Sequence, residues 1–116
     1  MPPVEDFRPL SAVEFHILAA MARGPRHGYG IMQEVEARSS GSVRLRPGTL
    51  YGALKRMLQD GLVRETDAPH EGSEEERRRY YALTARGLEV LRADARRLEA
   101  LVRYARATRI LRPRPT

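Results

Sequence analysis

The spacing of apolar residues changes period twice along the chain, and these changes limit the folds that it can adopt. Between Leu10 and Asp60, apolar residues recur three or four positions apart, as they do in helices that bury one face. Residues 62–67 alternate between apolar and polar side chains, and residues 77–84 can form a return strand. From Thr84 the helical spacing resumes. The sequence therefore predicts three helices, a hairpin and a long last helix.

Glycine and proline divide the first sixty residues into three predicted helices, over residues 10–23, 28–40 and 47–60. Three short helices joined by tight turns form a tri-helical helix-turn-helix, and a hairpin directly after them is the wing of a winged helix. The predicted fold is thus mainly α with a small β-hairpin. It comprises a winged helix-turn-helix domain over residues 1–83 and a C-terminal dimerisation helix with its tail over residues 84–116.

Apolar residues of the last helix follow the spacing of a heptad seam. The positions are Leu88, Leu91, Ala95, Leu98, Val102 and Ala105. A seam of this length needs a partner helix, and a second copy of the chain is the simplest source, so we expect a homodimer. The alternative is that the seam packs against the first helix of its own chain.

Several function classes are excluded or disfavoured by what the sequence lacks. Without cysteine there is no disulfide scaffold, thiolate zinc site or cysteine nucleophile. The histidines do not have metal-binding spacing, and neither a nucleophile elbow nor a phosphate loop is present, so we expect no enzyme, cofactor or metal. The start, MPPVEDFRPL, does not resemble a signal peptide, and no apolar run approaches the ~20 residues of a membrane span. The expected location is the cytoplasm, with no membrane partner.

The net charge of +6 is unevenly distributed. Residues 44–64 carry five basic side chains against one acid, and residues 103–116 carry five arginines and no acid, whereas acids outnumber arginines in residues 65–79. A coding bias toward arginine explains why only one of the 21 basic residues is lysine, but it does not explain the clustering. Local basicity of this kind favours nucleic acid as the partner.

The predicted helix over residues 47–60 combines an apolar face with a small, basic one. Leu50, Leu54, Met57 and Leu58 are expected in the core, with Tyr51 beside them. The residues predicted to lie opposite are Thr49, Gly52, Ala53 and Arg56, with Lys55 to the side and with Arg44 and Arg46 just before the helix. Small residues let a helix approach base edges in the major groove of double-stranded DNA, and cations beside them reach phosphates. The alternative is an ordinary solvated helix face.

The predicted wing carries charges of both signs. Arg77, Arg78 and Arg79 lie on its return strand, where we expect them to contact phosphates. Glu71 and the run at 74–76 occupy its tip, and these acids should be repelled by DNA.

The segments EFHILAAMARGPRHGYGIMQEVE, RLRPGTLYGALKRMLQDGLV and RRRYYALTARGLEVL occur in an order that resembles the PadR family of bacterial transcriptional regulators, over about residues 10–102. The resemblance implies a winged helix, a two-fold dimer through the last and first helices, and operator binding by the helix at 47–60 with the wing. It also implies a repressor released by a small molecule. The family positions that match are Tyr29, Thr49, Tyr51 and Lys55. The resemblance places Tyr51 near the DNA backbone, whereas periodicity alone places it beside the core.

The expected function is that of a homodimeric, sequence-specific transcriptional repressor whose operator is an inverted repeat. Phe15, Val102 and Tyr104 could line an effector pocket near the dimer interface, although they could equally be ordinary dimer core. Two other functions remain open. The winged helix could bind an acidic protein partner, or the chain could sense a small molecule without binding DNA.

Overall fold

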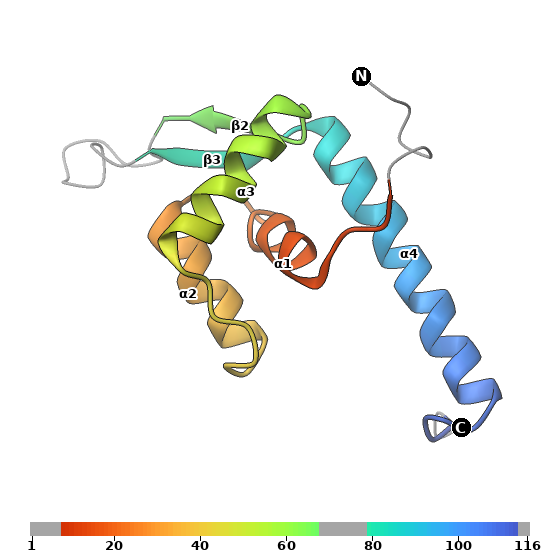
Figure 1. Ribbon diagram of the computed structural model, residues 1–116. Coiled ribbons are helices and arrows are strands. Elements are labelled where there is room, and N and C mark those ends of the chain that lie inside the picture. The colour runs from red at the N-terminus through yellow and green to blue at the C-terminus, as the bar shows by residue number, and fades with distance from the viewer. Residues whose placement is uncertain (1–7, 68–78, 114–116) are drawn as a thin grey trace.

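The computed structural model describes residues 8–67 and 79–113, and these residues form a mostly helical body with a small antiparallel sheet (Figure 1). The elements, in chain order, are α1 (Ala12–Ala20), β1 (Arg26–His27), α2 (Gly28–Arg38), α3 (Pro47–Gln59), β2 (Val63–Thr66), β3 (Tyr80–Leu83) and α4 (Ala85–Ala107). The winged-helix architecture expected from the sequence is confirmed. None of the helices in the described ranges is long and apolar enough to cross a membrane.

The ends of the helices follow from local side-chain and backbone chemistry. At the start of α1, the Ser11 hydroxyl accepts from the backbone N–H of Glu14 and the Glu14 carboxylate accepts from that of Ser11, at 3.1 and 2.8 Å. This reciprocal pair satisfies two N–H groups that would otherwise lack partners. After α3 the chain reverses at Gly61, whose φ of 74° lies in the left-handed region that favours glycine. Helix α1 ends at Ala20, earlier than predicted, because residues 21–23 form turns.

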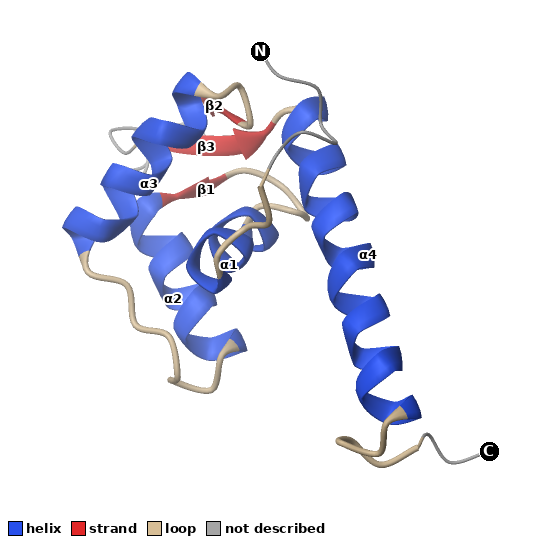
Figure 2. Ribbon diagram, turned by 45° about the vertical axis from the view of Figure 1, so that its right-hand side comes forward, coloured by secondary structure: helices blue, strands red, loops and turns tan. Residues whose placement is uncertain are grey.

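The sheet contains one strand that the sequence did not predict. Figure 2 shows β3 between β1 and β2, and both pairings are antiparallel. The hairpin of β2 and β3 was expected, but β1 lies in the segment predicted to be only a turn. Because β3 is the central strand, Tyr80 and Ala82 are buried as well as Tyr81. The alternating pattern of a half-exposed strand is therefore absent from β3.

The core lies among the first three helices and extends to α4. Its fully buried large side chains are Ile17, Leu18, Ile31, Val35, Leu50 and Leu54. Val90 and Leu91 of α4 belong to the same cluster. The domain boundary after Leu83 thus stays a prediction, since the first part of α4 shares the core of the preceding helices.

A tight joint connects the start of α4 to the turn between α3 and β2. The Thr84 hydroxyl donates to the Gly61 carbonyl at 2.6 Å and accepts from the Gly87 N–H at 3.0 Å, so Thr84 caps α4. The Thr84 N–H donates to the Leu62 carbonyl at 3.1 Å. Gly87 is buried directly against the Leu62 backbone, where a side chain has no room.

The two halves of α4 have different environments. Gly87, Val90, Leu91 and Asp94 are buried against the body, but from Ala95 onward the helix projects away from it (Figure 1). Ala95, which the heptad pattern assigns to the seam, is exposed in the single chain, while its neighbour Asp94 is buried. The use of the seam as a dimer contact therefore stays a prediction. Four large apolar side chains of the projecting half are exposed, namely Leu98, Leu101, Val102 and Tyr104.

Candidate nucleic-acid interface

Helix α3 presents a face of small and cationic residues. Leu50, Leu54 and Met57 anchor it in the core as predicted, while Thr49, Lys55 and Arg56 are exposed. Arg46 is the N-cap and its side chain makes no capping hydrogen bond, so N–H groups of the first turn have no side-chain partner. Pro47 at the first helical position needs none. An open helix start flanked by cations is suited to a phosphate.

Ala53 does not lie on this face, and the prediction that it is exposed was wrong. Its side chain is 2% exposed and belongs to the core cluster. Ala53 lies three residues after Leu50 and four before Met57, so it shares their side of the helix. Gly52 remains partly exposed, and a methyl group placed there would lie 3.7 Å from a guanidinium nitrogen of Arg56. The Arg56 side chain thus runs back along the helix toward Gly52.

Two tyrosines extend this face onto the neighbouring elements. Tyr51 is 47% exposed and Tyr29 is 56% exposed. The Tyr51 ring rests on the backbone of Gly28, because a methyl group added there would lie 2.8 Å from its ring carbon Cζ. Tyr51 is thus not a core residue, and its exposure agrees with the position implied by the family resemblance. The close approach requires glycine at position 28, which sequence reasoning did not single out.

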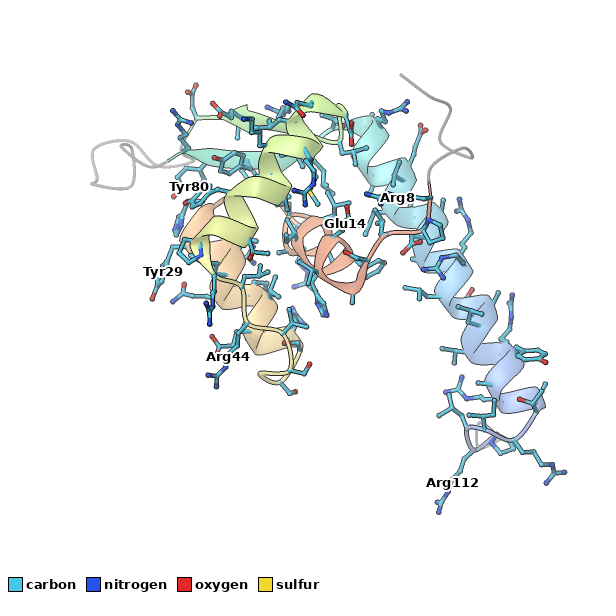
Figure 3. All side chains as sticks on the ribbon, in the orientation of Figure 1. Arg8, Glu14, Tyr29, Arg44, Tyr80 and Arg112 are labelled. Carbon is cyan, nitrogen blue, oxygen red and sulfur yellow. The ribbon has the colours of Figure 1, made fainter. Side chains whose placement is uncertain are left out.

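His27 holds the start of α2 next to the sheet. Its Nδ1 atom accepts from the Gly30 N–H at 2.9 Å, which caps α2. Its ring is nearly parallel to that of Tyr29, with centroids 6.4 Å apart, and meets Tyr80 edge-on at 5.3 Å. His27, which lies in the predicted turn, therefore fixes the position of Tyr29 at the start of the following helix. Figure 3 shows Tyr29 and Arg44 pointing outward on the side of the body away from the projecting half of α4.

The cations that the sequence predicts to contact DNA fall into three groups. Arg44 pairs with Glu36 at 3.5 Å and Arg79 pairs with Glu65 at 3.7 Å, and both arginine side chains are largely exposed. Exposed ion pairs of this kind contribute only about 0–1 kcal/mol, so a phosphate can replace the carboxylate at little cost. Within residues 8–67 and 79–113, Arg46, Lys55 and Arg56 form no ion pair. Arg77, Arg78 and the acids predicted at the wing tip lie outside the described residues.

The residues predicted to line an effector pocket do not come together in one chain. Phe15 lines a cavity of about 380 Å³ between α1 and α2, whereas Val102 and Tyr104 are not among its lining residues and lie exposed on α4. The far wall carries Glu34, which accepts from Arg38 Nε at 2.7 Å and faces Arg26 at 3.6 Å. The hydrogen bond from Arg38, with a smaller contribution from the Arg26 charge, lowers the pKa of Glu34 despite opposition from partial desolvation.

Elsewhere in the described part of the chain there is no group of histidine, aspartate and glutamate side chains able to hold a metal ion.

Comparison with known proteins identifies relatives that match most of the chain. Residues 17–93 match the model of the transcriptional regulator PadR-like family. The chain is 38% identical over 93 residues to the transcriptional regulator Rv3488 of Mycobacterium tuberculosis, covering 80% of this chain and 81% of that protein. It is also 40% identical over 85 residues to an uncharacterized 37.1 kDa protein in transposon TN4556 of Streptomyces fradiae. There the match covers 73% of this chain but only 22% of the relative.

Solved structures that share the fold include the following two. A PadR family transcription regulator from Clostridium difficile superposes with a TM-score of 0.71 at 26% identity, covering 84% of this chain and 98% of that one. Bacillus subtilis PadR, solved in complex with operator DNA, superposes with a TM-score of 0.58 at 18% identity, covering 91% of this chain and 51% of that one. The second likeness concerns the fold alone.

Proposed function

Because the chain belongs to the PadR-like family of transcriptional regulators, we propose that it is a homodimer that binds a specific DNA operator and represses transcription until a small molecule releases it. A transcriptional regulator is not an enzyme, which confirms that expectation from the sequence. A repressor of this kind acts in the bacterial cytoplasm, where the DNA lies.

The exposed face of α3 is the observation that carries the proposal. Thr49, Gly52 and Arg56 lie along it and face the bases, while Arg46 and Lys55 reach phosphates on either side. Ala53 is excluded from this set by its burial. Tyr29, Tyr51, Arg44 and Arg79 widen the contact toward the DNA backbone. Arg77 and Arg78, which lie outside the described residues, are proposed as further phosphate contacts from the sequence alone.

The projecting half of α4 supports the dimer. Its exposed Leu98, Leu101 and Val102 form an apolar stripe on a helix that has already left its own core. A stripe like this is covered when a second copy packs against it. A two-fold dimer presents two α3 helices about one DNA turn apart, roughly 34–36 Å, so the operator is an inverted repeat.

A second copy would bring together the residues of the predicted effector pocket. Phe15 lies at the α1–α2 cavity, while Val102 and Tyr104 lie on the part of α4 that the dimer would cover. We therefore place the effector site between subunits, with Phe15 from one chain and the α4 residues from its partner. The cavity is lined both by apolar side chains, such as Phe15 and Val35, and by charged ones, such as Glu34. An effector held there would need an apolar body and a polar group.

A gel-shift titration against the chain's own upstream region, repeated over a series of salt concentrations, tests the proposal. Each lost phosphate contact lowers the slope of log affinity against log salt by about 0.9. Arg46→Ala and Lys55→Ala should each lower the slope by about that amount. Arg92→Ala removes an exposed cation on α4, which is not among the proposed DNA contacts, and should leave the slope unchanged.

Two outcomes would count against the proposal. If Arg46→Ala and Lys55→Ala both keep the wild-type slope, the phosphate contacts are assigned to the wrong residues. If the protein binds its upstream region no more tightly than unrelated duplex DNA, a role in binding an acidic protein partner is favoured instead.

A further inference from the structure

Asp94 is the one buried charged side chain in the described part of the chain, at 6% exposure. It lies in the middle of α4, and the residues that precede it on the buried face, Val90 and Leu91, are apolar. An apolar residue would be expected at such a position, because burying a carboxylate costs several kcal/mol unless partners compensate for the lost water. The presence of aspartate here therefore needs an explanation other than core packing.

The hydrogen bonds that Asp94 accepts all go to one of its two carboxylate oxygens. Its Oδ1 atom accepts from the Leu10 backbone N–H at 3.3 Å and from Arg97 Nε at 2.9 Å. Its Oδ2 atom is buried and has no hydrogen-bond partner. Leu10 directly precedes Ser11, the N-cap of α1, so one carboxylate joins the fourth helix to the start of the first.

The hydrogen bonds of Asp94 fix the orientation of α4 relative to α1, and they add little to the stability of the fold. Replacing a buried, incompletely paired charge by an apolar group of similar size is often neutral or stabilising. Apolar contacts such as those of Val90 and Leu91 allow small rotations and shifts of a helix, whereas a hydrogen bond to one backbone N–H fixes both. The bond to Leu10 therefore fixes how α4 is rotated against α1.

Asp94 is also the last buried residue before α4 leaves the body. The thirteen residues from 95 to 107 extend beyond it by roughly 20 Å at 1.5 Å per residue. A small rotation at Asp94 thus becomes a large displacement at the far end. We propose that Asp94 is a positioning residue that sets the direction of the projecting half of α4 and, through the dimer, the operator spacing that the two α3 helices accept. This inference rests on the proposed dimer and its operator.

The direction of α4 can be measured without DNA. The chain has no cysteine, so Gln59→Cys and Arg103→Cys, both at exposed positions, attach spin labels to the ends of α3 and α4 only. Labelled chains diluted with an excess of unlabelled chain report the distance within one chain. We expect one narrow distance distribution for Asp94 and a broadened or shifted one for Asp94→Leu. An unchanged distribution in Asp94→Leu would overturn the proposal.

The operator spacing is tested with duplexes that the wild-type protein selects from a random library, and with versions carrying one base pair more or fewer at the dyad. One base pair turns the half-sites by about a tenth of a helical turn. We expect wild-type affinity to fall on the order of tenfold and that of Asp94→Leu to fall by under about threefold. Val90→Ala is the control, because it weakens the same helix contact without removing the bond to Leu10 and because Val90 does not belong to the predicted dimer seam.

The outcomes separate this inference from the proposed function. If the wild-type protein selects no sequence, the operator is wrong and the distance measurement alone decides the role of Asp94. If Asp94→Leu does not fold, the carboxylate is needed for stability and the proposal is overturned. If Val90→Ala also loses its spacing preference, any loosening of the helix has that effect and Asp94 has no special role.

Discussion

Gly87→Ala tests how rigidly α4 is attached to the turn after α3. A methyl group at position 87 would lie 2.9 Å from the carbonyl carbon of Leu62 and closer still to its oxygen, and that carbonyl accepts from the Thr84 N–H. The obstacle is backbone, so it cannot rotate aside as a side chain could. Relief requires α4 to move away from the turn, which also weakens the bonds made by Thr84.

The expected loss of stability follows from three terms. Overpacking against backbone costs about 3 kcal/mol, the upper part of its usual range, and weakening of the Thr84 bond adds about 1 kcal/mol. Alanine regains about 1 kcal/mol because it favours the helix more than glycine does. The net loss is about 3 kcal/mol, which lowers the melting temperature by roughly 10–20 °C for a domain of this size.

Thermal and urea unfolding at one fixed protein concentration measure this loss, since the stability of a dimer depends on concentration. Gly48→Ala is the matched control, because Gly48 lies exposed in the first turn of α3 with nothing within 4 Å of an added methyl group. We expect that control to be unchanged or slightly stabilised. Equal stability of the Gly87 and Gly48 variants would refute the tight joint.

Two further predictions concern the DNA-facing side and the α1–α2 cavity. Gly28→Ala pushes the Tyr51 ring outward, so we expect weaker DNA binding in gel shifts with little change in melting temperature; equal affinity would remove Tyr51 from the interface. Because its pKa is lowered, Glu34 stabilises the fold above its ordinary pKa of 4.5, and that stability is lost as the pH falls below this value. Arg38→Ala should flatten the dependence of the free energy of unfolding on pH in this range. If that dependence is the same in the variant and the wild-type protein, Glu34 does not contribute to stability in this way.

The sequence predicted the elements whose signals are local. The apolar residues of α3 lie on one side of the helix, and this side faces the core as predicted. The alternation of apolar and polar residues at 62–67 predicted the strand that is observed as β2. Strand β1 could not be predicted in this way, since its two residues carry no periodicity and become a strand only by pairing with β3. Long-range pairing of this kind cannot be read from a short segment.

Two side chains show why the candidate site and the last helix were harder to predict. A small residue such as Ala53 fits either face of a helix, so its position depends on how closely α3 approaches the core. Asp94 was passed over because a heptad pattern assigns the buried position to Ala95, and no pattern in a single sequence indicates a buried acid. The family resemblance, and not the periodicity, indicated that Tyr51 lies outside the core, since its exposure depends on the absence of a side chain at Gly28. Its contact with the DNA backbone stays a prediction.

The joint between Gly61–Leu62 and Thr84–Gly87 has a consequence for making chimaeras of related regulators. Its hydrogen bonds and close backbone contact link two segments that are more than twenty residues apart in sequence. Exchanging α4 at its first residue would separate Thr84 and Gly87 from the turn that they fit. A crossover beyond Asp94 keeps the joint and the tie to Leu10 intact, so the projecting half of α4 is the segment that can be exchanged between proteins as a unit.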